Sequence, residues 1–232
     1  MDTMSIVINL VKPKDWAISI DLTDAYFHVP IFQQHRPYMR LCIANQCYQW
    51  KAMYFGPTCA PGIFTKLVSV VAAYLRTQNI RMSVYLDDWL IVNQNQQQLV
   101  QDRLKCLNLL VSLGFMINID KSSLVPSQVI TYLGGVFHLD QGLVYPTMER
   151  IEKLQILLEK MLSGQNLALD FLKILGMMAS CIELIPNARL FMRPIQLHLL
   201  SFWRPVSKNM LAHVPLTHLK SHLLWWKNYS TR

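Results

Sequence analysis

Apolar residues among the first 146 positions recur at two different spacings, which predicts a domain that mixes strands and helices. Apolar runs at residues 16–20 and 48–52 predict buried strands, and the first of these runs ends at Asp21. Apolar residues at helical spacing predict helices at residues 61–76 and 97–113. Elements of both kinds in one stretch are typical of an α+β arrangement.

Two hairpins are predicted where a short polar turn separates two apolar runs. The first spans residues 80–92, with Asp87 and Asp88 at its turn. The second spans residues 130–145, with residues 140–142 at its turn.

The pattern changes at Pro146, because the apolar residues that follow it keep a helical period. The predicted helices are residues 148–162, 167–184 and 188–203. The pattern therefore predicts an α+β domain at residues 1–146 and an all-helical segment at residues 147–232.

Composition excludes several classes of protein. Hydrophobic residues make up 52 % of the chain and charged residues 16 %, which is not the composition of a disordered protein. The longest uncharged apolar stretch, at residues 68–75, is shorter than the roughly 18 residues of a membrane-spanning helix, and the N-terminus lacks a basic signal. We therefore expect a soluble protein of the cytoplasm or nucleus with no membrane partner.

Cysteine and histidine spacing gives no metal site. The five cysteines are an odd number without a C-x-x-C motif, so we expect reduced, mostly buried thiols and no disulfide framework. His28 alternates with apolar residues and is interpreted as structural. The histidines after residue 190 lack a paired spacing with carboxylates or cysteines, so zinc is not expected.

The net charge of +8 is concentrated near the C-terminus. Residues 1–183 hold 15 basic and 14 acidic residues, whereas residues 184–232 hold no acidic residue. The seven basic residues there are Arg189, Arg193, Arg204, Lys208, Lys220, Lys227 and Arg232. This asymmetry favours a polyanionic partner, and a solvated helix face is the alternative.

Carboxylates follow two of the predicted apolar strands. An apolar strand that ends in Asp21, and a hairpin with Asp87 and Asp88 at its tip, are unusual because a buried charge is costly unless it is paired or bound to metal. Two hard cations about 3.5–4 Å apart, held by such carboxylates, stabilise an in-line phosphoryl transfer. Aspartate is also a common turn residue, so the Asp87-Asp88 pair alone would be weak support.

Five local motifs resemble those of reverse transcriptases, in the order found in that family. Tyr85-Leu86-Asp87-Asp88 resembles the Y-x-D-D signature, and residues 21–30 resemble the first catalytic motif of retroviral and retrotransposon enzymes. The other matching segments are residues 55–64, Leu113-Gly114-Phe115 with Lys121-Ser122, and the primer-grip-like residues 132–137. The resemblance implies a polymerase palm, in which helices pack on one face of an antiparallel sheet, followed by a helical thumb or connection-like segment.

The resemblance also implies roles at the catalytic centre. Asp21 and Asp87 would ligate two Mg²⁺ or Mn²⁺ ions, and Asp88 would complete the acidic set. Leu22 would offer its backbone carbonyl to one ion.

A second set of residues is implied to bind the incoming deoxynucleoside triphosphate. Asp24 and Ala25 would present backbone N–H groups to the phosphates, and Tyr26 would stack beneath the sugar and exclude a ribose 2′-hydroxyl. The remaining residues of the set are Phe55 and Gly56, which would line the pocket, and Lys121, which would contact or protonate the leaving pyrophosphate. A core tyrosine at 26 and a solvated lysine at 121 are the alternatives.

The resemblance further implies contacts to an RNA or DNA template with its primer. The primer grip would consist of Tyr132, Leu133, Gly134 and Gly135. The basic residues Arg189, Arg193, Arg204 and Lys208 would contact the nucleic-acid backbone.

The segment at residues 186–196, followed by Trp225-Trp226, is similar to the region after the palm in DIRS-type retrotransposons. Only about 20 residues precede Asp21, and no carboxylate follows Glu183. We therefore expect a fragment that lacks most of the fingers and the ribonuclease H domain. A catalytically inactive, nucleic-acid-binding remnant of such an element is the alternative to an active polymerase.

Overall fold

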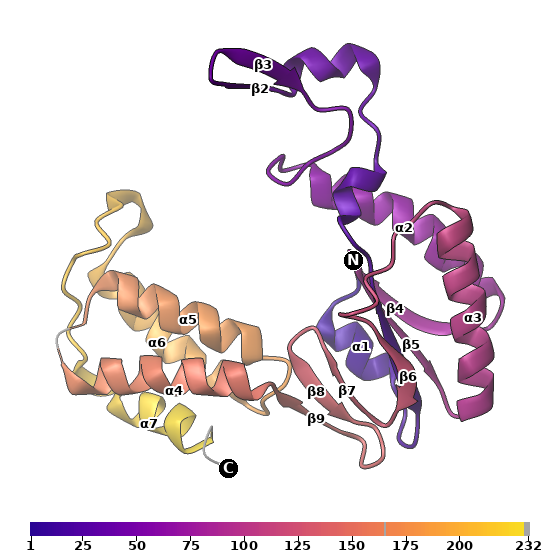
Figure 1. Ribbon diagram of the computed structural model, residues 1–232. Helices are drawn as coiled ribbons and strands as arrows, with labels where there is room; N and C mark the ends of the chain where they lie inside the picture. The colour runs from indigo at the N-terminus through magenta and orange to yellow at the C-terminus, as the bar shows by residue number, and fades with distance from the viewer. Residues whose placement is uncertain (165, 230–232) are drawn as a thin grey trace. The chain divides into compact units, whose positions relative to one another are not determined.

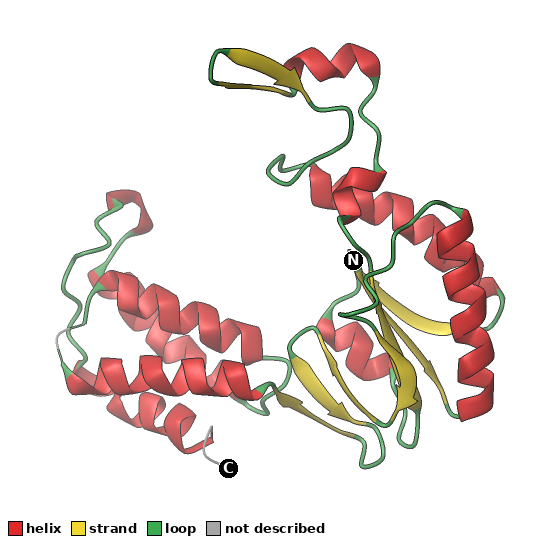
Figure 2. Ribbon diagram, in the orientation of Figure 1, coloured by secondary structure: helices red, strands yellow, loops and turns green. Residues whose placement is uncertain are grey.

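The computed structural model describes residues 1–164 and 166–229, and the chain forms two compact units (Figure 1). The first unit consists of residues 1–133 and 137–143, and the second of residues 134–136 and 144 onward. Figure 2 shows strands and helices together in the first unit, whereas every named element after β9 is helical. The fold is of the α+β class, as the sequence predicts.

A four-stranded sheet in the order β4-β5-β1-β6 is the centre of the first unit. Its strands are β1 (Trp16–Asp21), β4 (Arg81–Tyr85), β5 (Asp88–Asn93) and β6 (Ser123–Ser127). Strand β5 is antiparallel to both β1 and β4, which confirms the predicted hairpin. β6 is a strand that the sequence did not predict.

Helices α2 (Ala60–Thr77) and α3 (Gln96–Ser112) supply the apolar core of this sheet, as predicted from their spacing. Because side chains alternate along a strand, Trp89 and Ile91 of β5 point to the helices. Asp88 and Leu90 therefore point to the opposite face.

A short N-terminal helix, α1 (Met4–Leu10), also belongs to the first unit and was not predicted. The Asp2 carboxylate before it accepts hydrogen bonds from Arg76 at 2.9 Å and from the Val84 backbone N–H at 3.0 Å. These contacts join the start of the chain to α2 and β4.

Strands β2 (Arg40–Ile43) and β3 (Gln46–Gln49) form a separate hairpin after two short 3₁₀ helices, η1 (Ala25–His28) and η2 (Gln33–Tyr38). Its two-residue turn, Ala44-Asn45, has positive φ at both positions. Cys42 and Cys47 lie opposite each other and form a disulfide, so the expectation of no disulfide was wrong. The turn brings them together, although their spacing matches no common disulfide pattern.

The predicted second hairpin is a three-stranded sheet in the order β7-β8-β9. The strands are β7 (Val129–Tyr132), β8 (Gly135–His138) and β9 (Leu143–Pro146). The chain reverses at Leu133 and Gly134, both of which have positive φ, so the single run expected at residues 130–138 is two strands.

The second unit contains four α-helices among its described residues. They are α4 (Met148–Ser163), α5 (Ala168–Cys181), α6 (Ala188–Phe202) and α7 (Lys220–Tyr229). Buried residues of all four, including Leu158, Phe171, Leu199 and Trp226, form one apolar cluster. Within the part of the chain that the structure describes, no helix is long and apolar enough to cross a membrane.

Candidate active site

The aspartates at 21, 87 and 88 come together at one end of the β1–β5 pair. Asp21 ends β1 and lies directly opposite Asp88, the first residue of β5, so their side chains share one face of the sheet. Asp87 lies in the two-residue turn between Tyr85 and Asp88, where Leu86 has a left-handed φ of 54°. The turn is tied to β1, because the Leu22 N–H donates to the Asp87 carbonyl at 3.1 Å.

The three carboxylates interact electrostatically. Burial, and then the charge of Asp87, raises the pKa of Asp21, while Lys121 and a hydrogen bond from Asn118 oppose the increase. Burial, followed by the charges of Asp87 and Asp21, raises the pKa of Asp88 to about 6, and Lys121 again opposes the increase. The site therefore concentrates negative charge that a bound cation would stabilise.

The oxygen donors at this site fit magnesium. Over residues 1–164 and 166–229, no three or more His, Cys, Asp or Glu side chains are arranged to hold a metal ion. Mg²⁺ needs fewer, because it is commonly held by one or two carboxylates, several waters and substrate phosphates. Asp21 and Asp87 supply carboxylate donors of this kind, and Leu22, whose N–H bonds to the Asp87 carbonyl, directly follows Asp21.

Hydrogen bonds to the backbone of Asp21 and Asp88 hold these residues in place. The sequence did not predict this positioning role for the residues that make them. The backbone N–H of Asp21 donates to Ser122 Oγ at 3.0 Å, and the Asn118 N–H donates to the Asp21 carbonyl at 2.8 Å. Tyr132 Oη donates to the backbone carbonyl of Asp88 at 2.9 Å. Ser122 and Tyr132 lie in segments with a recognisable motif, but their partners are set by tertiary contacts.

Two of the residues predicted to bind a nucleotide, Tyr26 and Lys121, lie close enough to the aspartates to interact with them electrostatically. Tyr26 is buried, with its ring centroid 4.7 Å from that of the exposed Phe55 and 5.8 Å from that of Phe64. Burial, and then the charge of Asp87, raises the pKa of Tyr26. The structure therefore brings Tyr26 and Phe55 together close to Asp87.

The backbone around this pocket is unusual at two predicted positions. Asp24 has a left-handed φ of 52°, and its carbonyl accepts from the Phe27 N–H at 2.8 Å, which starts the 3₁₀ turn at Ala25. Gly56 has a φ of 133°, which L-residues rarely adopt. Lys121 is exposed and close enough to Asp21 to affect its pKa.

His28 has structural contacts at both ring nitrogens. Nδ1 lies 3.1 Å from the carbonyl of Ala25, and Nε2 accepts from the Met116 N–H at 3.0 Å. Its ring centroid lies 5.1 Å from that of Phe115.

The predicted primer-grip residues occupy the turn between β7 and β8. Gly134 has a φ of 77°, and a Cβ there would lie 2.1 Å from Cζ of Arg150. Gly135 is buried, whereas Leu133 is partly exposed. Only glycine fits at position 134 without displacing the arginine.

Two of the basic residues near the C-terminus form ion pairs with carboxylates from earlier in the chain. Arg189 lies 2.6 Å from Glu183, and Lys227 lies 3.3 Å from Glu159. Arg193 donates to Gln196 at 2.6 Å. The structure describes no ion pair for Arg193, or for the exposed residues Arg204, Lys208 and Lys220, and Arg232 lies outside the described residues.

The raised pKa of Asp88 predicts a pH-dependent cost to folding. The pKa of the Asp88 carboxyl is 3.8 in the unfolded chain and about 6 in the folded one. Its contribution to stability is therefore fully present below pH 3.8 and is lost as the pH rises through about 6. Solvent screens this partly exposed carboxyl, which reduces the full effect of the shift, so Asp88→Asn should raise the free energy of unfolding by about 1–2 kcal/mol at about pH 7, and by much less at about pH 4.

Urea unfolding with a metal chelator present would measure this difference, and Asp140→Asn, which changes an exposed aspartate, is the control. An equal effect of Asp88→Asn at both pH values would contradict the assignment.

An antiparallel sheet with three carboxylates at the end of two strands is typical of metal-dependent nucleotidyltransferases. A family profile described as "Reverse transcriptase (RNA-dependent DNA polymerase)" matches residues 2–137. The chain belongs to this reverse transcriptase family, which generally uses divalent metal ions.

The chain is similar to several curated viral proteins. The chain is 31 % identical over 144 residues to the Gag-Pol polyprotein of Rous sarcoma virus subgroup B (strain Schmidt-Ruppin), which covers 57 % of this chain and 9 % of the polyprotein. It is 24 % identical over 148 residues to Protein P of duck hepatitis B virus (strain China), covering 63 % of this chain and 19 % of that protein. The chain therefore spans only a small part of these relatives.

Solved structures share the fold. The foamy viral protease-reverse transcriptase in complex with an RNA/DNA hybrid matches with a TM-score of 0.78 at 18 % identity, covering 100 % of this chain and 29 % of that one. The same protein in complex with double-stranded DNA matches with a TM-score of 0.75 at 19 % identity, covering 100 % of this chain and 45 % of that one.

Proposed function

We propose that the chain carries out template-directed DNA synthesis as the RNA-directed DNA polymerase of a retrotransposon. The observation that carries this proposal is the meeting of Asp21 with Asp87 and Asp88, from segments 66 residues apart, beside the buried Tyr26. In this proposal residues 1–146 are the palm with a remnant of the fingers, and residues 147–232 are the thumb or connection.

Asp21 and Asp87 would hold two Mg²⁺ or Mn²⁺ ions with help from the Leu22 carbonyl, and Asp88 would complete the acidic set. When bound, such ions stabilise the charge on the phosphoryl group and on the attacking and leaving oxygens. The chain's own part is to hold the carboxylates, which the hydrogen bonds from Asn118 and Tyr132 support.

The triphosphate would lie against the backbone N–H groups of Asp24 and Ala25, with its sugar over Tyr26. Phe55 and Gly56 would border the base, because Phe55 is exposed and its ring lies against Tyr26. Lys121 would contact the leaving pyrophosphate, which is supported by its electrostatic interaction with Asp21 and Asp88.

The template and primer would contact the turn at Tyr132–Gly135 and the basic residues of the second unit. Arg193, Arg204 and Lys208 are the strongest candidates, because the structure gives them no carboxylate partner among the described residues. Arg189 would have to exchange its contact with Glu183 for a phosphate.

A DIRS-like retrotransposon is the proposed source, on the basis of the segment at residues 186–196 and the Trp225-Trp226 pair. The second candidate is an inactive remnant that binds nucleic acid. Binding of this kind would need only the exposed basic residues of the second unit, whereas Asp21, Asp87 and Tyr26 support the enzyme.

Primer extension on RNA and DNA templates, with Mg²⁺ or Mn²⁺, tests the proposal. Metal-dependent incorporation of deoxynucleotides by the 232-residue chain would support the polymerase. Template–primer binding with no extension under any metal would favour the remnant.

Sugar selectivity gives a prediction specific to Tyr26. Tyr26→Val should increase ribonucleotide incorporation relative to deoxynucleotide incorporation by roughly 10- to 100-fold, because the ring that would meet the 2′-hydroxyl is removed. Competition between the two nucleotide types during primer extension measures the ratio. Tyr26→Phe keeps the ring and should keep the selectivity, and an unchanged ratio in an active Tyr26→Val enzyme would refute the role.

A further inference from the structure

Helix α2 is apolar on two sides, and only one of them is covered. Phe64, Val68 and Leu75 pack into the core of the sheet. A second apolar stripe follows helical spacing along the exposed side, at Ile63, Leu67, Val70 and Tyr74. Val70 is 70 % exposed and Tyr74 56 %, whereas a helix that is apolar all round is normally buried.

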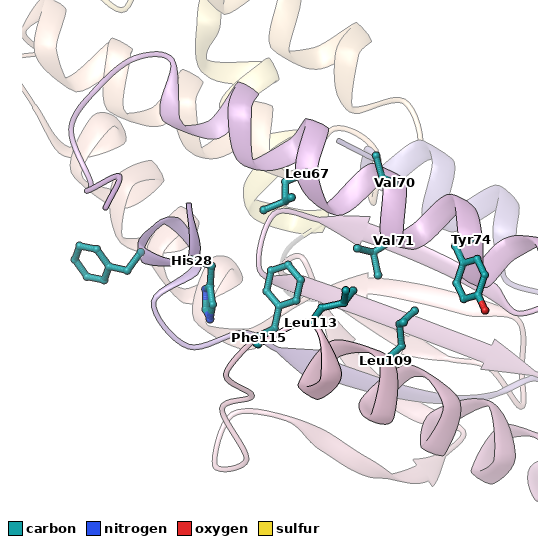
Figure 3. A pocket seen from close by; sticks show the side chains of 10 residues that line it. His28, Leu67, Val70, Val71, Tyr74, Leu109, Leu113 and Phe115 are labelled. Carbon is teal, nitrogen blue, oxygen red and sulfur yellow. The ribbon is translucent and has the colours of Figure 1, made fainter. Parts of the chain in front are cut away.

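This stripe borders a groove between α2 and α3. Figure 3 shows Val71 of α2 pointing towards Leu109 of α3, and Phe115 lying between His28 and Leu113, the residue that follows α3. The groove has a volume of about 830 Å³ and is lined mainly by apolar atoms. Contiguous exposed apolar surface of this kind marks a binding surface more often than a solvated one.

The charges beside the groove have one sign. Lys66 lies one turn before Val70, and Lys105 lies one turn before Leu109, so both lysines flank the apolar residues. Within these two fully described helices, the only acidic residue is Asp102, which is buried and bonded to Asn93 and Gln98. An occupant that complements the groove is therefore apolar on one side and acidic at its edges.

The length of the stripe indicates the shape of the occupant. The α2 residues that line the groove run from Leu67 to Tyr74, a separation of 7 residues, or about 10 Å at about 1.5 Å per residue, which is two helical turns. A groove between two helices with anchors along this length suits an amphipathic helix that presents residues at i, i+3, i+4 and i+7.

We propose that the α2–α3 groove is a docking site for an acidic amphipathic helix of another polypeptide. A second copy of this chain fits less well, because each copy carries a net charge of +8 and face-to-face association would bring the flanking lysines together. The docking site is independent of the polymerase proposal, since no residue of the acidic centre lines the groove.

Fluorescence anisotropy of labelled peptides against the 232-residue chain tests the site. The probe is a helical peptide of about 18 residues with leucines at i, i+3, i+4 and i+7 and glutamates elsewhere. Two control peptides are used. The first has the same amino-acid composition in an order that places the leucines on all sides of the helix. The second keeps the leucine positions and has lysine in place of each glutamate. We expect the acidic peptide to bind at least about 10-fold more tightly than either control.

Substitutions then locate the binding. Val70→Glu should weaken the acidic peptide about 10-fold or more, and Val206→Glu, at another highly exposed valine, should not change its affinity. Lys66→Glu combined with Lys105→Glu should reverse the preference, so that the lysine peptide binds better. Because all these side chains are exposed, the variants should fold normally.

Three results would overturn the proposal. The first is equal binding of the ordered and reordered acidic peptides, or binding that Val70→Glu leaves intact. The second is a dimer of the free chain that Val70→Glu dissociates, which would assign the groove to a second copy. The third is binding to anionic lipid vesicles that Val70→Glu abolishes while the peptides do not bind, which would assign the surface to membranes.

Discussion

Asp21→Asn and Asp87→Asn should each reduce DNA synthesis by at least about 10³-fold while leaving template–primer binding nearly unchanged. Asparagine keeps the size of the side chain and removes the charge that would hold a divalent ion. The two residues lie close enough for Asp87 to raise the pKa of Asp21, so each variant also removes a repulsion. We therefore expect the variants to be at least as stable to heat as the parent chain.

The measurements are primer extension, template–primer affinity, Mn²⁺ binding and thermal unfolding on the same preparations. If the chain's own extension is too slow to measure, Mn²⁺ binding still reports on the site. Asp140→Asn is the matched control, because it removes a carboxylate that is exposed. Loss of nucleic-acid binding or of stability in step with activity would assign Asp21 and Asp87 a structural role instead.

The acidic centre could be predicted because its signals are local. Apolar runs on both sides of Asp87-Asp88 predict a hairpin, and the structure has one. The apolar run before Asp21 likewise predicts a buried strand, which is β1. The direct pairing of Asp21 with Asp88 could not be read from these runs, since register between distant strands depends on how the sheet packs.

Other elements lack a local signal. β6 has the sequence Ser-Leu-Val-Pro-Ser, in which serine and proline favour loops, and it is a strand because it pairs with the edge of β1. The Cys42–Cys47 disulfide depends on the positive-φ turn at Ala44-Asn45. Ala-Asn is not one of the dipeptides that favour such a turn, so the sequence did not indicate it.

The hydrogen bonds around the acidic centre could not be predicted from the sequence either. Tyr132 reaches the carbonyl of Asp88 across 44 residues of sequence, and Ser122 reaches the N–H of Asp21 across 101. Such contacts follow from the completed fold and not from any periodicity. The ion pair between Lys227 and Glu159 is another contact that depends on the completed fold. A count of charges within the C-terminal segment does not reveal such a pair.

Neutralising the four cations that form no ion pair with another described residue should weaken template–primer binding about 10³-fold at about 0.15 M salt, if all four contact phosphates. The substitutions are Arg193→Gln, Arg204→Gln, Lys208→Gln and Lys220→Gln, made together. Each phosphate contact contributes about −0.9 to the slope of log K against log salt on duplex DNA, so the slope should flatten by about 3.6 units. Removing residues 184–232 instead would take Leu199 and Trp226 out of the core and confuse charge with folding.

Binding titrations at several salt concentrations give both the slope and the affinity. Lys153→Gln is the control, because Lys153 is exposed in the same unit but pairs with Glu149. Arg189→Gln should have an intermediate effect, since Arg189 must leave Glu183 to reach a phosphate. A slope that the fourfold variant leaves unchanged would mean that these cations form a solvated surface, and that the affinity for nucleic acid comes from other residues of the chain.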